Sequence, residues 1–307
     1  MKIIATVLLA AGGWLGANHM LATANVRVAA SATRHQANPM GLFFNNTFGN
    51  VELYQRAGAM LIAGNCNRYD PQFEAARAAG AEVLAYFNPI EVYNQIPCKL
   101  NKGFYMDGRV PLWPFPEPGV RVNWPKSRMV DLRVGSTWMN YCVAYIENLM
   151  REGKVDGVFL DNVGARLWAR AGWDNWPKAE QDAWTDGEIE LVRRIDASRR
   201  RINPNFIVIT NNIWDRGDPR GFAGEKYVDG VVLEHPTLSS YHTKYAGREF
   251  SDLGHRRMVV IARNDEEAME WSHVPGVTHV ASQHDYSHPG PPLVPFTALT
   301  DRPKLPR

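Results

Sequence analysis

Two segments of the chain share one pattern, in which an apolar run leads to an acidic residue. Residues 155–162 read V-D-G-V-F-L-D-N and residues 228–235 read V-D-G-V-V-L-E-H. Each segment is expected to form a β-strand, and side-chain alternation then gives Asp161 and Glu234 equivalent positions at the ends of their strands. Asp156 and Asp229 fall at the opposite ends of these strands, where a turn or a cap is the expected role.

The chemistry that Asp161 and Glu234 could perform together is the cleavage of a glycosidic bond. In that reaction one carboxyl group protonates the departing oxygen, while the other attacks the sugar or activates a water molecule. Two acids that face one opening would meet both requirements. The alternative is that one of the pair only orients its neighbours or binds substrate.

The elements that must bring these acids together are short apolar runs that alternate with amphipathic segments. Continuous apolar strands between helices indicate a parallel sheet that is buried on both faces. Eight such units in about 240 residues predict an α/β protein with a single domain, a (β/α)8 TIM barrel. The alternative is an open doubly wound sheet, but no G-x-G-x-x-G follows the first strand and no P-loop motif occurs. The expected strands are 42–45, 60–64, 82–87, 155–160, 206–210, 228–233, 257–262 and 277–282, and the clearest helices are 71–79, 137–151, 177–201 and 265–271.

In a barrel of this kind the reacting groups follow the C-terminal ends of the strands. Every expected strand ends in residues that can form hydrogen bonds. One such residue could merely cap a turn, but eight polar ends together predict a pocket suited to a ligand that is rich in hydroxyl groups. The expected substrate-binding residues at these ends are Asn45, Tyr86, Asn88, Asn162, Asn212, His235, Arg263 and His284.

Residues 124–163, with M-V-D-L-R, a helical pattern and then V-D-G-V-F-L-D-N-V, resemble glycoside hydrolase family 114. Residues 85–93, A-Y-F-N-P-I-E-V-Y, resemble the third-strand segment of the same family. The resemblance runs through most of residues 40–285 and implies an endo-α-1,4-polygalactosaminidase-like (β/α)8 barrel. Carried over by position, it implies that Asp161 and Glu234 are the catalytic residues of the fourth and sixth strands. It also implies that the acidic residues Glu91 and Asp131 bind substrate.

The chain departs from the family pattern at two positions. Gly164 stands where the family commonly has another Asp, and Ile90 replaces a Gly. The resemblance therefore supports the class of enzyme but not the galactosaminoglycan specificity. A long insertion at residues 96–128 is expected to shape one wall of the cleft and is rich in prolines and aromatic residues, among them Trp113, Phe115 and Trp124.

The beginning of the chain has the features of an export signal. Lys2 supplies a positive charge, residues 3–11 form an apolar run, and residues 22–24 read A-T-A, which offers a small-residue cleavage site. The apolar run is too short to anchor the chain in a bilayer, so a secreted or periplasmic protein is predicted. The alternative is a buried or disordered N-terminal segment. The expected organisation is a signal peptide at 1–24, a linker at 25–39, the barrel at 40–287 and a proline-rich tail at 288–307.

Composition excludes some classes of protein and leaves others without support. With 45% hydrophobic and 21% charged residues in 307, the chain is not a disordered one. A formal net charge of +2 gives no argument for nucleic acid as a partner. No metal and no other cofactor is expected, because the first strand lacks H-x-H and no H-E-x-x-H occurs.

The three cysteines form no metal-binding pair such as C-x-x-C. Cys66 and Cys98 are expected in loops at the same end of the barrel, so an exported protein could join them by a disulfide bond. Cys142 lies in a helical pattern.

These observations predict a secreted glycoside hydrolase that cleaves a polysaccharide, amino-sugar polymers included. The expected partner is a polysaccharide or oligosaccharide substrate, without nucleic acid and without a stable membrane anchor. The alternative is a catalytically inactive barrel that binds carbohydrate. The presence of both Asp161 and Glu234 favours the enzyme, because a pure binding protein does not need two opposed acids.

Overall fold

The computed structural model describes residues 42–45, 60–64, 69–93, 110–114, 127–164, 173–211, 222–237, 257–274 and 277–282. The chain divides into two units, residues 1–38 and residues 39–307, and all described residues belong to the second. The predicted signal peptide, the predicted linker, the proline-rich tail, Cys66 and Cys98 lie outside the described residues.

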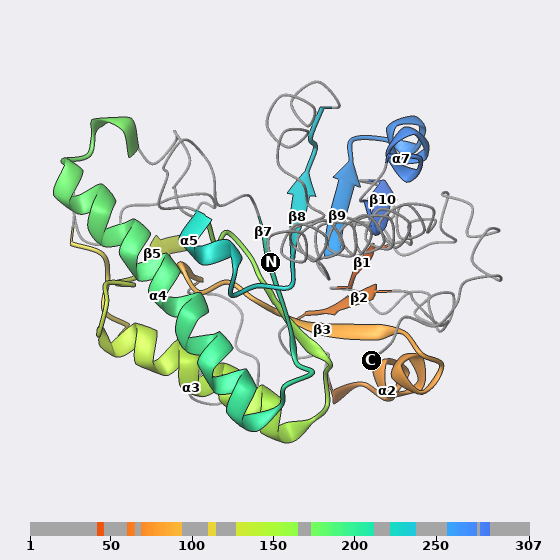
Figure 1. Ribbon diagram of the computed structural model, residues 1–307, viewed down its shortest axis with the longest axis horizontal. Helices are drawn as coiled ribbons and strands as arrows, with labels where there is room; N and C mark the ends of the chain where they lie inside the picture. Colours follow the sequence, from red (N-terminus) through yellow and green to blue (C-terminus); the bar gives the residue numbers. More distant parts are fainter. Residues whose placement is uncertain are drawn as a thin grey trace, which may run out of the picture. The chain divides into compact units, whose positions relative to one another are not determined.

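The central element is one sheet of eight parallel strands, and it confirms the predicted (β/α)8 barrel (Figure 1). Each strand pairs with its neighbour in the order β1-β2-β3-β6-β7-β8-β9-β10. The two end strands also approach each other, so the sheet curls into a nearly closed barrel. Their bounds are β1 Leu42–Asn45, β2 Met60–Ala63, β3 Glu82–Phe87, β6 Gly157–Leu160, β7 Ile207–Asn211, β8 Gly230–Glu234, β9 Arg257–Ala262 and β10 His279–Ser282.

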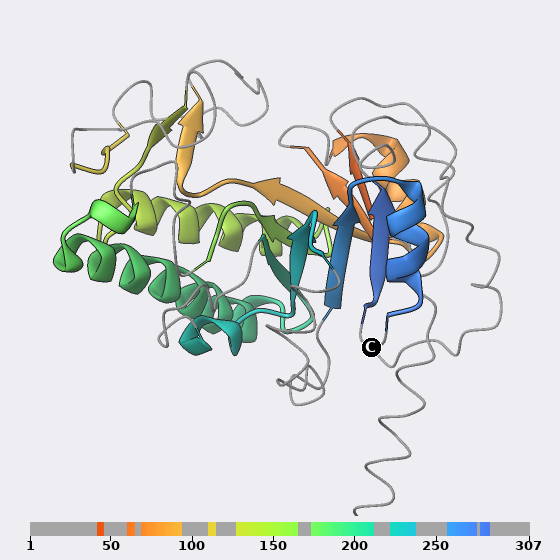
Figure 2. The ribbon, with the colours of Figure 1, turned by 90° about the horizontal axis from the view of Figure 1, so that it is seen from above.

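The described helices lie outside the strands and connect them (Figure 1, Figure 2). The two longest, α3 and α4, lie side by side, and Ser198 and Arg201 of α4 both hydrogen-bond to Glu147 of α3. Side chains cap three helices: Asp70 begins α2, Ser136 begins α3 and Asn264 begins α7. The helices are α2 Pro71–Ala78, α3 Thr137–Glu152, α4 Lys178–Ile202, α5 Phe222–Glu225 and α7 Asp265–Ser272.

The strands β2, β3 and β6 to β10 bury apolar side chains on both of their faces, as a parallel sheet between helices requires. One cluster fills the space between strands and helices. The other fills the barrel interior and consists of Met60, Ile62, Leu84, Phe159, Ile207, Ile209, Val232, Val259, Ile261 and Ala281. Because side chains alternate along a strand, the residue two positions beyond each interior residue faces the same way.

The N-terminal ends of the two similar strands are held by their first acidic residues, which confirms the stabilising role expected there. Asp156 accepts a hydrogen bond from the backbone N–H of Val83 at 2.9 Å and forms an ion pair with Arg77 at 3.0 Å. Asp229 accepts one from the N–H of Val208 at 2.8 Å and pairs with Arg199. β6 and β8 begin just after these residues.

A small antiparallel hairpin was not expected from the sequence. β4 (Glu91–Tyr93) pairs with β5 (Ser127–Met129), and Figure 2 shows the two strands standing apart from the barrel strands. Trp113 lies near the hairpin but is fully buried against Trp176 and Trp184, so it is a core residue and does not line a cleft. Phe115 and Trp124 lie outside the described residues.

Candidate functional site

Asp161 and Glu234 share a hydrogen-bond donor at the C-terminal end of the barrel. The side-chain nitrogen of Asn211 donates to Asp161 Oδ1 at 2.8 Å and to Glu234 Oε1 at 3.1 Å. These two oxygens therefore lie no further apart than the sum of the two distances, about 5.9 Å. The strands position all three residues, because each continues the inward-facing row above Phe159, Ile209 or Val232.

Asp161 is surrounded by donors. Besides Asn211, the Tyr86 hydroxyl donates to its Oδ2 at 2.5 Å and the Asn162 side-chain nitrogen donates to the same oxygen at 3.3 Å. Burial raises the pKa of Asp161 above its ordinary value, while the hydrogen bonds from Asn211, Tyr86 and the backbone of Asn162 lower it. The donors favour the ionised state of Asp161, because an ionised carboxylate can only accept hydrogen bonds and the side chains of Asn211, Tyr86 and Asn162 all donate to it.

The residue after each acid has an unusual backbone conformation. Asn162 has a φ of 64° and His235 a φ of 49°, both in the left-handed region that most side chains avoid. Asn adopts this conformation readily, whereas His does so less often and at a cost of order 1 kcal/mol. The two similar segments therefore end in the same sharp turn, directly after Asp161 and Glu234.

The sequence places Asn211 and Asn212 together at the end of the fifth strand, and the predicted substrate-binding residue there was Asn212 rather than Asn211. Asn212 lies outside the described residues, whereas Asn211 is the last residue of β7 and only 3% exposed. The signal was present in the sequence. Ile207, Ile209 and Asn211 alternate along one face of the strand, and the first two fill the barrel interior.

A second missed residue, Glu188 of α4, lies behind the loop that carries Asp161. Its side chain is fully buried and Oε2 accepts a hydrogen bond from the backbone N–H of Gly164 at 3.3 Å. Burial raises the pKa of Glu188 well above its ordinary value, against the hydrogen bond from Gly164. Glu188 thus supports the backbone three residues beyond Asp161.

Two predicted substrate-binding residues, Asn88 and Glu91, lie at the turn between β3 and β4. Asn88 Oδ1 accepts hydrogen bonds from the backbone N–H groups of Ile90 and Glu91, at 3.1 and 3.2 Å. Glu91 is 3% exposed. In this structure Asn88 therefore shapes the turn, and a substrate contact from either residue stays a prediction.

Asp131 is engaged with Arg133. Its two side-chain oxygens accept hydrogen bonds from the guanidinium of Arg133 at 2.8 and 2.6 Å, and its backbone oxygen accepts one from Ser136. These contacts order the turn before α3. The predicted role of Asp131 in substrate binding is not tested by them.

His235 and Arg263 lie exposed at the rim of the barrel, beside Glu234. The backbone N–H of His235 donates to the oxygen of Ile261, and Arg263 forms an ion pair with Glu267 at 2.5 Å. Asn45 ends β1, while Asn212 and His284 lie outside the described residues. Of the predicted site residues, the structure therefore brings Tyr86, Asp161, Asn162 and Glu234 together.

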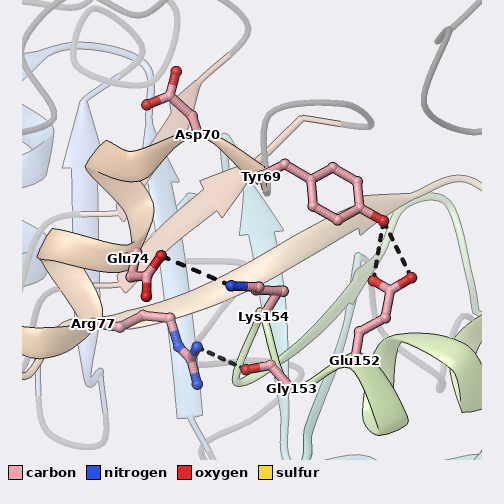
Figure 3. Close-up of a pocket in the computed structure, with 7 residues that line it drawn as sticks. All are labelled: Tyr69, Asp70, Glu74, Arg77, Glu152, Gly153 and Lys154. Carbon is pink, nitrogen blue, oxygen red and sulfur yellow. Dashed lines mark hydrogen bonds and ion pairs between the residues drawn. The ribbon is translucent and has the colours of Figure 1, made fainter.

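A charged pocket of about 320 Å³ lies between α2 and the C-terminal end of α3, away from Asp161 and Glu234 (Figure 3). Within it Tyr69 donates to Glu152 and Arg77 donates to the backbone oxygen of Gly153. Lys154 lies 3.8 Å from Glu74. These contacts join α2 and the nearby Tyr69 to the end of α3, which agrees with a stabilising role.

Within the described part of the chain, no group of His, Cys, Asp and Glu side chains is arranged to hold a metal ion. Among the same residues, no helix is both long and apolar enough to cross a bilayer. The described cysteine, Cys142, is buried in α3 and unbridged.

No family description and no curated protein sequence matches the chain. Solved structures do match. The glycoside hydrolase domain of PelA from Pseudomonas aeruginosa is 12% identical, with a TM-score of 0.57, and the match covers 81% of this chain and 96% of that domain. Aspergillus fumigatus Ega3, solved in complex with galactosamine, is 16% identical with a TM-score of 0.48, covering 75% of this chain and 78% of the other. At this level of identity the likeness to the PelA domain shows the fold alone, and it agrees with the barrel described above.

Proposed function

We propose that the protein is a glycoside hydrolase that cleaves a polysaccharide by a retaining mechanism. The observation that carries the proposal is the contact of Asp161 and Glu234 with one nitrogen atom, which limits their nearest oxygens to about 5.9 Å. Retaining enzymes have carboxyl groups about 5–5.5 Å apart, whereas inverting enzymes need about 6.5–9.5 Å to admit a water molecule.

Asp161 is the nucleophile in this proposal, and Glu234 is the acid and base. The donors around Asp161 favour its ionised form, and its side chain is less exposed than that of Glu234. Glu234 is exposed at the mouth, where it can reach the leaving group and incoming water. The charge on Asp161 also favours a proton on Glu234, because like charges this close disfavour double ionisation.

The reaction proceeds in two steps. An oxygen of Asp161 attacks the anomeric carbon while Glu234 gives its proton to the departing glycosidic oxygen, and a glycosyl ester forms on Asp161. Glu234 then removes a proton from water, and the water oxygen displaces Asp161 from the anomeric carbon. We propose a secreted or periplasmic setting for this reaction, supported by the export features of residues 1–24.

The test is a screen of the purified chain against amino-sugar and neutral polysaccharides, with release of reducing ends as the readout. Asp161→Asn is nearly isosteric, so it should keep the fold and substrate binding but lower turnover at least about a thousandfold. Binding of a polymer without release of reducing ends by the wild type would contradict the proposal. It would favour the alternative, an inactive barrel that binds carbohydrate.

The role of Glu234 has its own test. Glu234→Gln cannot donate a proton, so it should slow polysaccharide cleavage by about 10²–10⁴-fold. Aryl glycosides with an activated leaving group need little protonation, so the variant should keep most of the wild-type rate of the first step on these substrates. An equal loss on both kinds of substrate would contradict the assignment of Glu234 as the acid.

A further inference from the structure

Asn211 places both hydrogens of one amide group between two carboxyl groups. Nδ2 has two N–H donors, and one contact is made to Asp161 and one to Glu234. The reverse orientation of the amide would set its oxygen against two oxygens that accept hydrogen bonds. The chemistry of the three groups therefore determines which way the amide points.

The amide is held by a strand rather than by a loop. Asn211 is 3% exposed at the end of β7, and it is in register with Val232 of β8, two residues before Glu234. On its other side, β7 pairs with β6, whose last residue, Leu160, precedes Asp161. Asn211 thus lies on the strand between the two strands that carry the acids, and strands hold a site more firmly than loops do.

We propose that Asn211 is a positioning residue that sets the spacing of Asp161 and Glu234 and stabilises the carboxylate form of Asp161. This inference rests on the proposed retaining hydrolysis and deepens it. In the first step the nucleophile must be ionised while the acid must hold a proton. The hydrogen bond from Asn211 to Asp161 serves the first requirement. The second hydrogen of the Asn211 amide holds Glu234 Oε1 next to β7.

The polar groups around Asp161 come from three other strands and from the turn that carries Asp161 itself. Among the described residues they are the Tyr86 hydroxyl of β3, the side chain and backbone of Asn162, Asn211 of β7 and Glu234 of β8. Burial raises the pKa of Asp161, and the hydrogen bond from Asn211 is the largest of the effects that lower it. Loss of this donor should therefore raise the pKa of Asp161.

The test compares three substitutions of Asn211 with one control in the same strand. Asn211→Ala removes the donor, and Asn211→Asp keeps the shape but replaces the donor with a third acid. Asn211→Ser offers a shorter donor and guards against a variant that fails to fold. Thr210→Val is the matched control. Thr210 is buried and precedes Asn211 in β7, and because side chains alternate along a strand, it points away from the barrel interior.

The first readout is the pH dependence of kcat/KM on a polysaccharide that the wild type cleaves. Asn211→Ala should lower kcat/KM at neutral pH by about 10- to 100-fold and move the acidic limb to higher pH. Asn211→Asp should move it further, although its shape is closest to the native one, and Asn211→Ser should lie nearer to the wild type. Thr210→Val should leave the limb in place. A structural role alone would make the isosteric Asp the mildest change.

The second readout does not depend on activity. Carbon-13 NMR of protein labelled at its Asp carboxyl groups, with the Asp161 signal assigned by its absence from Asp161→Asn, gives the titration of Asp161 directly. Its midpoint should rise in the order wild type, Asn211→Ala, Asn211→Asp. Unchanged titration in both variants would overturn the inference, even if the wild type is an active hydrolase. A shifted titration in a protein that cleaves no polymer would support the electrostatic role of Asn211 and defeat only the proposed function.

Discussion

At the scale of single residues, Asp161 combines two opposed influences. Burial disfavours its charge, whereas the Tyr86 hydroxyl and the Asn211 amide favour it. A buried carboxylate is tolerated in proteins only where hydrogen bonds compensate for lost hydration. The site keeps the Asp161 carboxyl group partly out of water and supplies the donors that its charged form requires.

The net rise in the pKa of Asp161 predicts a pH-dependent stability difference. The folded state binds this proton more tightly than the unfolded state, so the contribution of Asp161 to stability is greatest below about pH 3.9, its unfolded pKa. It is lost as the pH rises through the higher folded pKa. Asp161→Asn has no such titration, so its melting temperature relative to the wild type should be higher at pH 7 than at pH 4.

Calorimetry of both proteins at a series of pH values checks this difference. A gap in melting temperature that stays constant from pH 4 to pH 7 would show that Asp161 titrates alike in the folded and unfolded states. If the melting temperature of Asp161→Asn relative to the wild type were higher at pH 4 than at pH 7, the folded pKa of Asp161 would be lowered, and the hydrogen-bond donors would outweigh burial.

Part of the site could be predicted from the sequence, and the reason is local. Asp161 and Glu234 follow apolar runs with the same pattern, so strand alternation alone aligns them. The engagement of Asp131 with Arg133 could not be foreseen, because it depends on the conformation of a turn. Nor could the bridging by Asn211, which requires the register of β7 between β6 and β8.

At the scale of elements, the two strands that carry the acids are built alike. Each is preceded by an Asp that holds the neighbouring strand, and each begins with a Gly at a point where the next strand leaves no room for a side chain. A Cβ on Gly157 would lie 2.3 Å from the backbone oxygen of Ile207, and one on Gly230 would lie 2.2 Å from that of Arg257. The strands therefore approach their neighbours closely at the N-terminal end of the barrel.

Gly157→Ala and Gly230→Ala should each lower the free energy of unfolding by at least about 2–3 kcal/mol, because backbone atoms must move to relieve the clash. Gly135→Ala is a control in which the added Cβ meets nothing within 4 Å but the φ is +80°. It should cost about 1–2 kcal/mol through backbone strain alone. Urea unfolding of the three variants measures the loss of unfolding free energy in each. A loss for Gly135→Ala equal to the other two would contradict the steric explanation.

Helix α4 contributes a buried acid to the site at a point where it lies close to the turn before α3. A Cβ on Gly187 would lie 2.3 Å from the backbone oxygen of Leu132, and the next residue is Glu188. Since burial raises the pKa of Glu188, its contribution to stability is present at low pH and is lost as the pH rises through the folded value.

Glu188→Gln keeps an oxygen for the N–H of Gly164 but does not titrate. Relative to the wild type it should therefore become more stable as the pH rises from 4 to 8. Denaturant unfolding at both pH values measures the change, with Glu190→Gln on the same helix as the control. Glu190 pairs with Arg193, which lowers its pKa, so this control should shift in the opposite direction.

Strands and long helices were predictable from apolar periodicity. The strands β2, β3 and β6 to β10 bury their two faces in the two core clusters, and α3 and α4 each bury one face in the larger cluster. The expected helix at 137–151 is observed as α3, Thr137–Glu152, between the side-chain cap of Ser136 and Gly153 with a φ of 62°. The hairpin of β4 and β5 was not predictable in this way. Its partners are separated by a long segment, and nothing in their composition specifies the pairing.

At the scale of the whole barrel, the two ends of the strands have different tasks. The N-terminal end carries Asp156, Asp229 and their arginine partners, which tie strands to helices. The C-terminal end carries Asp161 and Glu234, which the side chain of Asn211 joins by two hydrogen bonds. Because β6, β7 and β8 are consecutive strands of the barrel, the side chains at their C-terminal ends lie in one group.

This arrangement predicts the stereochemical outcome of hydrolysis. The nearest oxygens of Asp161 and Glu234 are within about 5.9 Å, which is less than the separation of about 6.5–9.5 Å in inverting enzymes and favours direct attack by Asp161 on the sugar. The first sugar released should therefore keep its anomeric configuration. Proton NMR of the anomeric signals in the first minutes of cleavage, before mutarotation, measures it. Release of the inverted anomer would contradict the retaining mechanism, and Asp161 would then be a base acting through water.

A fluorinated glycoside that traps the glycosyl ester gives an independent measurement of the same mechanism. Mass spectrometry should find the sugar on the peptide that contains Asp161. The same peptide of Asp161→Asn should carry no sugar.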